Sequence, residues 1–266
     1  MPKKSTLNVE SVNRQIVDWL KTYAEDAKSN GFVIGISGGV DSAVTSTLCA
    51  QTGLKVLCVE MPIHQAPSQV RRGREHIGEL KRRFPNVSNV EADLTATFEI
   101  FRKEVPETPE AAKVSLSLAN TRARLRMTTL YYFAGIYGLL VAGTGNKVED
   151  FGVGFYTKYG DGGVDLSPIA DLMKSDVYAL GEFLEIPKSI MQAAPTDGLF
   201  GDDRTDEDQL GASYDELEWA MLQDEAGKME NDYSDREKAV FEIYQRLHKT
   251  NQHKMNAIPV CLVHRY

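Results

Sequence analysis

Along the first half of the chain, segments with apolar residues at helical spacing alternate with short, continuous apolar runs. Apolar residues at helical spacing, such as Val12, Ile16 and Leu20, predict an amphipathic helix over residues 9–28. The apolar run at 32–37 is rich in β-branched residues and bounded by glycines, which predicts a buried strand. The same alternation predicts further helices at 43–51, 67–84 and 109–137, and further strands at 54–61, 87–94 and 138–145.

Strands that alternate with helices indicate parallel βαβ units. The predicted fold class is therefore α/β, a doubly wound parallel sheet with helices on both faces. Ligands of such sheets bind in the crevice at the carboxyl ends of the strands. Two glycine-rich segments, at 37–42 and 143–146, lie at the ends of predicted strands, so we expect both to line this crevice.

The pattern weakens after residue 150. Residues 151–168 are rich in Gly and Asp and predict a long loop, and the acidic stretch 196–208 predicts a mobile surface loop. Shorter helices are expected at 174–184, 213–222 and 234–249. No internal repeat and no linker composition interrupts the chain, so we expect residues 1–266 to form a single domain.

Composition narrows the class of protein. Of 266 residues, 42% are apolar and 26% are charged, which excludes disorder as the overall state. No apolar run approaches the ~20 residues that cross a bilayer, and the first residues lack the apolar segment of a secretory signal. The net charge of −8 disfavours broad binding to nucleic acid. The three cysteines show no CxxC spacing, which favours a reduced, cytoplasmic protein.

The sequence SGGVDS, at 37–42, carries the strongest chemical signal. Its two adjacent glycines allow a sharp turn in which backbone N–H groups converge, and the following helix adds its positive N-terminal end. Ser37 and Ser42 add hydroxyl donors, so the segment is typical of a phosphate or pyrophosphate cradle. Asp41 places a carboxylate beside it, which indicates Mg²⁺, a cation that commonly bridges protein and phosphates. The alternative is a tight strand–helix turn with a capping serine and no ligand.

The same segment resembles the SGGxDS pyrophosphate loop of the N-type ATP pyrophosphatases, which adenylate a substrate and release pyrophosphate. Further segments are similar to the NAD synthetase family and occur in the same order, so that the resemblance covers about residues 10–260. They are NTRARLRM at 120–127, GTGNKVED at 143–150, the TKYGDGG-containing segment at 155–177, APTDGL at 194–199, LGASYDEL at 210–217 and HK at 253–254. The chain offers no room for a glutaminase domain before the loop, which is typical of the short, ammonia-dependent form.

The resemblance implies a reaction and a set of residues for it. Such enzymes adenylate the nicotinate carboxylate of deamido-NAD with ATP, release pyrophosphate, and let ammonia displace AMP to give NAD. Ser37, Asp41 and Ser42 are the candidate catalytic residues, and Asp41 and Glu149 are the candidate magnesium ligands. Lys174 suits a phosphate as a mobile point charge. The implied ATP-binding residues are Gly35, Ile36, Ser37, Gly38, Gly39, Val40, Asp41, Ser42, Thr144, Lys174 and Thr196.

The resemblance also implies residues for the acceptor substrate. They are Arg124, Lys158, Asp165, His253 and Lys254, all for binding deamido-NAD. Arg122, Arg124 and Arg126 would point from different faces of one helix. We choose Arg124 as the one that reaches the dinucleotide, and we expect the other two to be salt-bridged or solvated. The glycine-rich loop that holds Lys158 and Asp165 would close over the substrate and exclude water.

A homodimer is implied as well, because the C-terminal tail of such enzymes reaches the substrate of the partner subunit. One aromatic set is expected in the core and at the dimer interface: Tyr131, Tyr132, Phe133 and Tyr137. Two segments depart from the family pattern. GTGNKVE at 143–149 replaces the GTDHAAE of many members, and the tail lacks the basic, proline-containing sequence expected after HK. These departures affect details of the pocket and not the predicted reaction.

Two other functions remain open from the sequence. A different adenylating ATP pyrophosphatase, such as one that thiolates tRNA, would need catalytic cysteines and a basic RNA-binding face, and the chain offers neither. A non-catalytic nucleotide-binding module would bind ATP without releasing pyrophosphate. The pairing of Asp41 with Glu149 argues against such a module, because a pure binder needs no second magnesium carboxylate.

Overall fold

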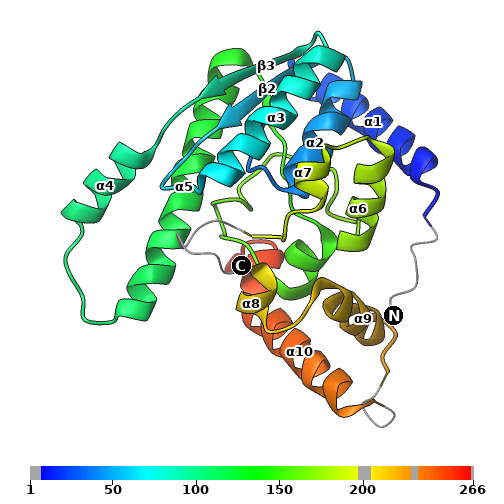
Figure 1. Ribbon diagram of the computed structural model, residues 1–266. Helices are drawn as coiled ribbons and strands as arrows, with labels where there is room; N and C mark the ends of the chain where they lie inside the picture. The colour runs from blue at the N-terminus through cyan, green and yellow to red at the C-terminus, as the bar shows by residue number, and fades with distance from the viewer. Residues whose placement is uncertain (1–6, 197–204, 229–232, 265–266) are drawn as a thin grey trace.

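The computed structural model describes residues 7–196, 205–228 and 233–264. Within these residues, four parallel strands form one sheet in the order β3-β2-β1-β4 (Figure 1). Phe32 of β1 lies opposite Val56 of β2 on one side and Leu140 of β4 on the other. The strands are β1 (Gly31–Gly35), β2 (Lys55–Glu60), β3 (Val87–Glu91) and β4 (Leu140–Val141).

The order of the strands creates the ligand crevice. β2 and β3 follow β1 to one side of the sheet, whereas β4 lies on its other side, so the strand order reverses between β1 and β4. Doubly wound sheets bind ligands at the carboxyl ends of the strands that flank such a switch point. The loop after β1 and the segment after β4 therefore meet there, and the predicted α/β fold class is confirmed.

Helices cover both faces of the sheet. Successive strand residues point to opposite faces, so a strand of consecutive apolar residues makes both faces apolar. Phe32 and Ile34 of β1 lie in one apolar cluster with side chains of α1, α2, α3 and α6. Val33, between them in sequence, lies in a second cluster with Val59 of β2 and Ala134 of α5. These helices are α1 (Val9–Asp26), α2 (Val40–Gln51), α3 (Pro67–Arg83), α5 (Ala111–Tyr137) and α6 (Lys174–Phe183).

The sequence pattern does not predict α4 (Thr95–Glu104). Its buried side is reduced to Phe98, so a helical period in its apolar residues is faint. α4 and the first turns of α5 project from the body of the molecule as an arm (Figure 1), on which Ile100 and Phe101 are exposed. Neither this helix nor any other in the described parts of the chain is long and apolar enough to cross a membrane.

The fourth strand is shorter than predicted, and the segment 143–146 is a loop. Gly138 ends α5 in the left-handed conformation, with φ 64°, so the strand cannot begin there. After β4 the backbone turns toward another segment, and the Gly143 N–H donates to the Leu166 C=O at 2.8 Å. The backbone therefore leaves the sheet directly at the crevice.

The C-terminal half of the chain adds a third apolar cluster. Val148 and Val153, from the π-helical turn η1, pack with Leu217 of α9 and Tyr244 of α10. The serine before each of α9 and α10 accepts from a backbone N–H of the first turn, which confirms both predicted helix starts. The remaining elements are η1 (Val148–Val153), α7 (Lys188–Met191), α8 (Asp206–Leu210), α9 (Tyr214–Glu225) and α10 (Asp235–Met255).

The predicted surface loop at 196–208 is wrong where the structure describes it. Residues 197–204 lie outside the described residues. Asp206 begins α8, which Thr205 caps by accepting from the Asp208 N–H at 3.1 Å. Asp206 is only 6% exposed and faces the crevice, so this end of the acidic stretch belongs to the site rather than to the outer surface.

Candidate active site

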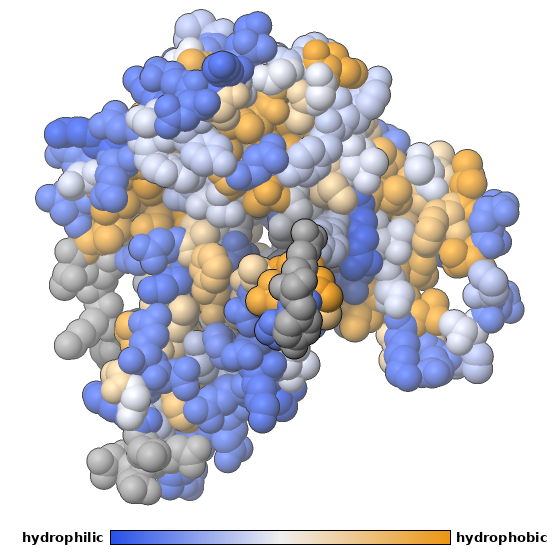
Figure 2. Space-filling model, turned by 180° about the vertical axis from the view of Figure 1, so that it is seen from behind, coloured by the Kyte–Doolittle hydropathy of each residue, from blue (hydrophilic) through white to orange (hydrophobic). Residues whose placement is uncertain are grey.

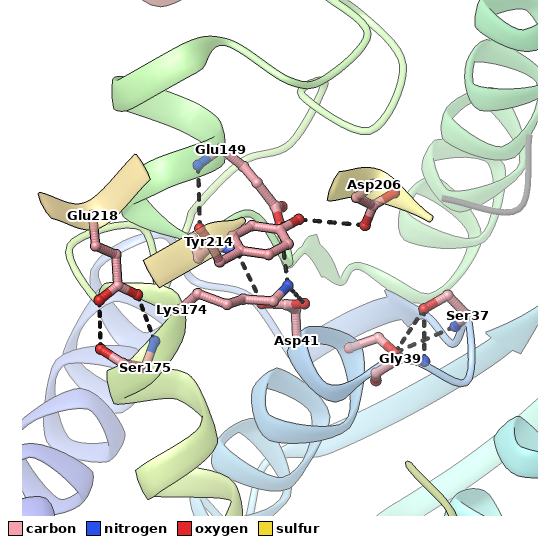
Figure 3. Close-up of polar contacts among 11 residues, drawn as sticks. Ser37, Gly39, Asp41, Glu149, Lys174, Ser175, Asp206, Tyr214 and Glu218 are labelled. Atoms are coloured by element: carbon pink, nitrogen blue, oxygen red, sulfur yellow. Dashed lines mark hydrogen bonds and ion pairs between the residues drawn. The ribbon is translucent and has the colours of Figure 1, made fainter. Parts of the chain in front are cut away.

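The loop between β1 and α2 is closed on itself by its two serines (Figure 3). Ser42 Oγ accepts from the Ser37 N–H at 3.3 Å and donates to the Gly39 C=O at 3.0 Å. Ser37 Oγ lies 3.1 Å from Ser42 Oγ and accepts from the Gly39 N–H at 3.2 Å. Within the described residues, no side chain caps the first turn of α2, which lines the crevice. Its N–H groups are therefore placed to bind an anion.

Gly38 fixes the shape of this loop against α3. Its φ is +82°, and a Cβ atom added there would lie 2.5 Å from the carbonyl oxygen of Gln69 and 3.2 Å from the nitrogen of Gly73. Arg72 of the same helix donates its Nε–H to the Gly38 C=O at 3.1 Å. Only glycine permits both the left-handed conformation and this close approach of two backbones.

We expect Gly38→Ala to raise the KM for ATP about 10-fold or more, because the added methyl group forces the loop away from α3. Gly53→Ala is the matched control, since Gly53 also has a positive φ of 77° but no atom within 4 Å of the added Cβ. Both variants carry backbone strain, whereas only Gly38→Ala carries the collision. Equal KM values for ATP in the two variants, measured by pyrophosphate release, would contradict the expected role of the loop.

A buried lysine joins the two carboxylates that the sequence pairs as magnesium ligands (Figure 3). Nζ of Lys174, in the first turn of α6, lies 2.6 Å from Asp41 Oδ2 and 3.1 Å from Glu149 Oε1. The Lys174 side chain is only 4% exposed. Burial alone would lower the pKa of Lys174, but the two carboxylates outweigh it and hold that pKa well above its ordinary value. The ammonium is therefore charged and ion-paired, and not the mobile charge expected from the sequence.

Two further side chains contact these carboxylates, and neither of them is predicted from the sequence. Asn146 donates its amide to Asp41 Oδ1 at 3.1 Å, and Tyr214 donates its hydroxyl to Glu149 Oε1 at 2.6 Å. The Tyr214 hydroxyl also lies 3.3 Å from Asp206 Oδ2. Tyr214 lies within a segment that resembles the NAD synthetase family, a signal that could have found it, whereas Asn146 is one of the positions at which 143–149 departs from the family pattern.

The phosphate loop, Glu149 and Lys174 line one cleft of about 270 Å³ at the carboxyl ends of β1 and β4. Every residue that the sequence analysis assigns to ATP lies on its wall, as does Glu149. They are loop residues 35–42 together with Thr144, Lys174 and Thr196. The structure thus brings the predicted ATP residues together from four segments of the chain, while their individual roles stay predictions.

The five residues assigned to deamido-NAD do not line this cleft. Arg124 donates to the C=O of Lys158 at 3.3 Å, and Lys158 Nζ donates to the C=O of His253. Lys254 Nζ donates to two backbone carbonyls of the glycine-rich loop at 2.7 and 2.8 Å. Four of the five residues therefore lie where α5, that loop and the end of α10 meet, beside the cleft rather than in it.

Asp165, the fifth, ties the glycine-rich loop to the sheet. Its Oδ1 accepts from the Tyr131 hydroxyl at 2.9 Å, and its Oδ2 accepts from the Val141 N–H at 2.8 Å. Of the aromatic set expected in the core and at the dimer interface, Tyr132 and Tyr137 are 63% and 51% exposed. They lie outside the core, because α5 packs on the sheet through a different face, and their place at a dimer interface stays a prediction.

Of the three arginines on α5, Arg126 lines the cleft and Arg124 does not. Arg126 donates Nε–H to the Met61 C=O at 3.0 Å and Nη2–H to Gln65 Oε1 at 2.7 Å. Arg122 places its guanidinium 4.4 Å from the centroid of the Phe98 ring. Arg126 therefore lies at the cleft, while the choice of the arginine that contacts the substrate stays a prediction.

A protein-only metal site is absent from the described residues, in which no three His, Cys, Asp or Glu side chains are grouped. The two predicted magnesium ligands nevertheless converge. Asp41 from α2 and Glu149 from η1 contact the same ammonium group. The position between them is therefore suited to positive charge.

Most of the chain, and not the cleft alone, matches a known family. A family model described as NAD synthase matches residues 12–258. The protein belongs to the NAD synthase family. This confirms the resemblance stated from the sequence motifs, and with it the predicted class of enzyme, a ligase of the NAD synthetase type.

Individual family members are similar over nearly their full length. The NH(3)-dependent NAD(+) synthetase of Carboxydothermus hydrogenoformans is 35% identical over 249 residues, which cover 93% of this chain and 96% of that protein. The enzyme of the same name from Mesoplasma florum is 36% identical over 244 residues, with 91% and 92% covered. Among solved structures, NMN synthetase from Francisella tularensis matches with a TM-score of 0.82 at 30% identity, covering 98% of this chain and 100% of that one. NH3-dependent NAD synthetase from Campylobacter jejuni, at 23% identity and a TM-score of 0.77 over 96% of this chain and 100% of that one, shares the fold.

Proposed function

We propose that the protein amidates deamido-NAD with ammonia at the expense of ATP, giving NAD, AMP and pyrophosphate. The observation that carries this proposal is the convergence of all residues assigned to ATP in one cleft of an NAD synthase family member. Curated relatives named as NH(3)-dependent synthetases support ammonia as the nitrogen source. We also propose a cytoplasmic location, which agrees with this use of ATP.

The proposed reaction requires a site that binds pyrophosphate as it leaves ATP. An oxygen of the nicotinate carboxylate attacks the α-phosphorus of ATP, the bond to pyrophosphate breaks, and an acyl-adenylate forms. Ammonia then attacks the acyl carbon, AMP leaves, and the nitrogen loses a proton. The N–H groups at the start of α2 and the Lys174 ammonium stabilise the charge that develops on pyrophosphate. Ser37 and Ser42 shape the loop, since their hydroxyls bond within it.

The oxygen donors of the cleft fit Mg²⁺ that arrives with ATP. Asp41 and Glu149 present carboxylates to one position, which the Lys174 ammonium occupies. Mg²⁺ is commonly held by one or two carboxylates plus phosphate oxygens and waters, so no third protein ligand is required. The ion, when bound, neutralises charge on the phosphate oxygens. Lys174 lies beside both carboxylates, so its ammonium is within reach of a phosphate bound there.

We assign the acceptor substrate and a homodimer contact to the surface beside the cleft. The residues carried over for deamido-NAD meet there, at α5, the glycine-rich loop and the end of α10. Apolar side chains are exposed nearby, among them Ile258 and Leu262 of the C-terminal tail, and Figure 2 shows more of them on the arm of α4 and α5. Exposed apolar patches of this kind mark contacts between proteins, and a second subunit would cover them.

One observation favours a second acceptor. The chain is similar to NMN synthetase from Francisella tularensis at 30% identity and over the full length of that structure. NMN forms when the nicotinate carboxylate of a mononucleotide is amidated, so the adenylation chemistry in the cleft is the same. None of the residues assigned to the dinucleotide lines the cleft, which leaves nicotinate mononucleotide as the alternative acceptor.

A single reaction series tests both functions. The protein is incubated with ATP, Mg²⁺ and ammonium, with either deamido-NAD or nicotinate mononucleotide, and NAD, NMN, AMP and pyrophosphate are quantified. We expect NAD and AMP in equal amounts from deamido-NAD, and far less product when glutamine replaces ammonium. Faster formation of NMN from the mononucleotide would move the assignment to the second acceptor. Folded, dimeric protein that makes neither product would overturn both.

A further inference from the structure

Tyr214 is a buried tyrosine whose hydroxyl reaches the charged cluster. It begins α9, and its ring lies in the third apolar cluster, together with Val148 and Val153 of η1. The hydroxyl donates to Glu149 Oε1 at 2.6 Å, a short bond to a carboxylate of the kind that is stronger than one between neutral groups (Figure 3). Tyr214 does not line the cleft, and the reaction proposed above gives it no step.

The Glu149 carboxylate depends on this contact for its orientation. Its Oε1 accepts from both Tyr214 and, at 3.1 Å, Lys174 Nζ. No donor among the described residues contacts its Oε2. Two donors on one oxygen fix the rotation of the carboxylate and leave the other oxygen for a ligand. The Lys174 ammonium is shared with Asp41, whereas Tyr214 contacts only Glu149 of these two carboxylates.

Two further contacts show that Tyr214 acts on the cation position and not only on the core. Its hydroxyl lies farther from Asp206 Oδ2, at 3.3 Å, so its single proton is given to Glu149. Its ring faces the Lys174 ammonium, which lies 4.6 Å from the ring centroid. The side chain therefore touches both the anion and the cation that meet at the predicted metal position.

We propose that Tyr214 is a positioning residue for the metal–ATP complex. Its hydroxyl fixes the Glu149 carboxylate in the orientation that receives the divalent cation of the nucleotide. The proposal rests on one part of the proposed function, namely that the cleft binds a metal ion and ATP. It is independent of which acceptor is amidated.

The test compares Tyr214→Phe with the wild-type protein. The variant keeps the ring and removes the hydroxyl. Mn²⁺ binding is measured by electron paramagnetic resonance in the presence of a non-hydrolysable ATP analogue, and the Mg²⁺ dependence of pyrophosphate release is measured at saturating ATP. We expect Mn²⁺ affinity to fall about 10-fold, and the Mg²⁺ concentration for half-maximal activity to rise by a similar factor. The maximal rate at saturating Mg²⁺ is expected to change less.

Tyr244→Phe is the matched control. Tyr244 is equally buried in the same apolar cluster, and no hydrogen bond of its hydroxyl occurs among the described residues. It is expected to leave both metal measurements unchanged. A Tyr214→Phe protein with the Mn²⁺ affinity and Mg²⁺ dependence of Tyr244→Phe would overturn the proposal, even if its unfolding temperature were lower. Wild-type protein that binds Mn²⁺ with the analogue but makes neither NAD nor NMN would overturn the proposed reaction, while the comparison of Mn²⁺ affinities still decides the role of Tyr214.

Discussion

Asp41→Asn is expected to lower turnover about 10³-fold while the protein stays folded. Asp41 Oδ2 contacts the Lys174 ammonium at 2.6 Å, and the carboxylate lies at the start of α2 beside the phosphate loop. The amide keeps the size of the side chain but removes the charge that attracts a divalent cation. The measurement is the kcat for AMP formation at saturating ATP and acceptor.

Folding is expected to change less than turnover, because Lys174 keeps Glu149 as an anionic partner. Loss of one of two charged acceptors from a buried ammonium costs roughly 1–3 kcal/mol, which lowers the unfolding temperature by several degrees. Asp171→Asn is the control, since the Asp171 side chain is 98% exposed and lies 3.6 Å from Lys147. Turnover of Asp41→Asn within about 10-fold of that control would refute the magnesium role of Asp41.

Lys174→Met is expected to produce the second large effect, a loss of turnover of about 10²–10³-fold. Methionine fills a similar volume, but pyrophosphate loses a preorganised positive charge as it departs. The variant also leaves Asp41 and Glu149 facing one position without a cation. Mg²⁺ without nucleotide is therefore expected to raise the unfolding temperature of this variant more than that of the wild type.

Lys147→Met provides the comparison for Lys174. Lys147 also lies near two carboxylates, Asp171 at 3.6 Å and Glu225 at 3.4 Å, but it is not on the wall of the cleft. Its replacement is expected to leave kcat unchanged and to give no added stabilisation by Mg²⁺. If Lys174→Met turned over as fast as Lys147→Met, the ammonium would have no part in catalysis.

The sheet and the phosphate loop could be predicted from the sequence because their signals are local. The β-branched run at 32–37 and the SGGVDS segment that overlaps its end are contiguous, and each determines its own backbone conformation. The serines before α9 and α10 likewise cap the helices that directly follow them. Glu149 and Lys174 came from the family resemblance rather than from any local pattern.

The parts that could not be predicted depend on contacts between distant segments. Lys174 and Asp41 lie 133 positions apart in the chain, and Tyr214 and Glu149 lie 65 apart. A lysine in an amphipathic helix is expected in solvent, because charged side chains are rarely buried unless they are paired. The pairing that reverses this expectation is visible only in three dimensions. The same holds for the end of β4, which is set by a bond to Leu166.

Because of η1, this site depends on the number of residues in one short segment more than on which residues they are. It is a π-helical turn over Val148–Val153, and such a turn accommodates one more residue than an α-helical turn. Glu149 near its start contacts Lys174, and Val153 at its end packs in an apolar cluster, so deleting one residue between them would shorten the segment that spans these two fixed contacts. Either Glu149 would then point away from Lys174 or Val153 would leave its apolar cluster. Conservative substitutions in η1 are therefore compatible with an intact cleft, whereas a single-residue deletion is not.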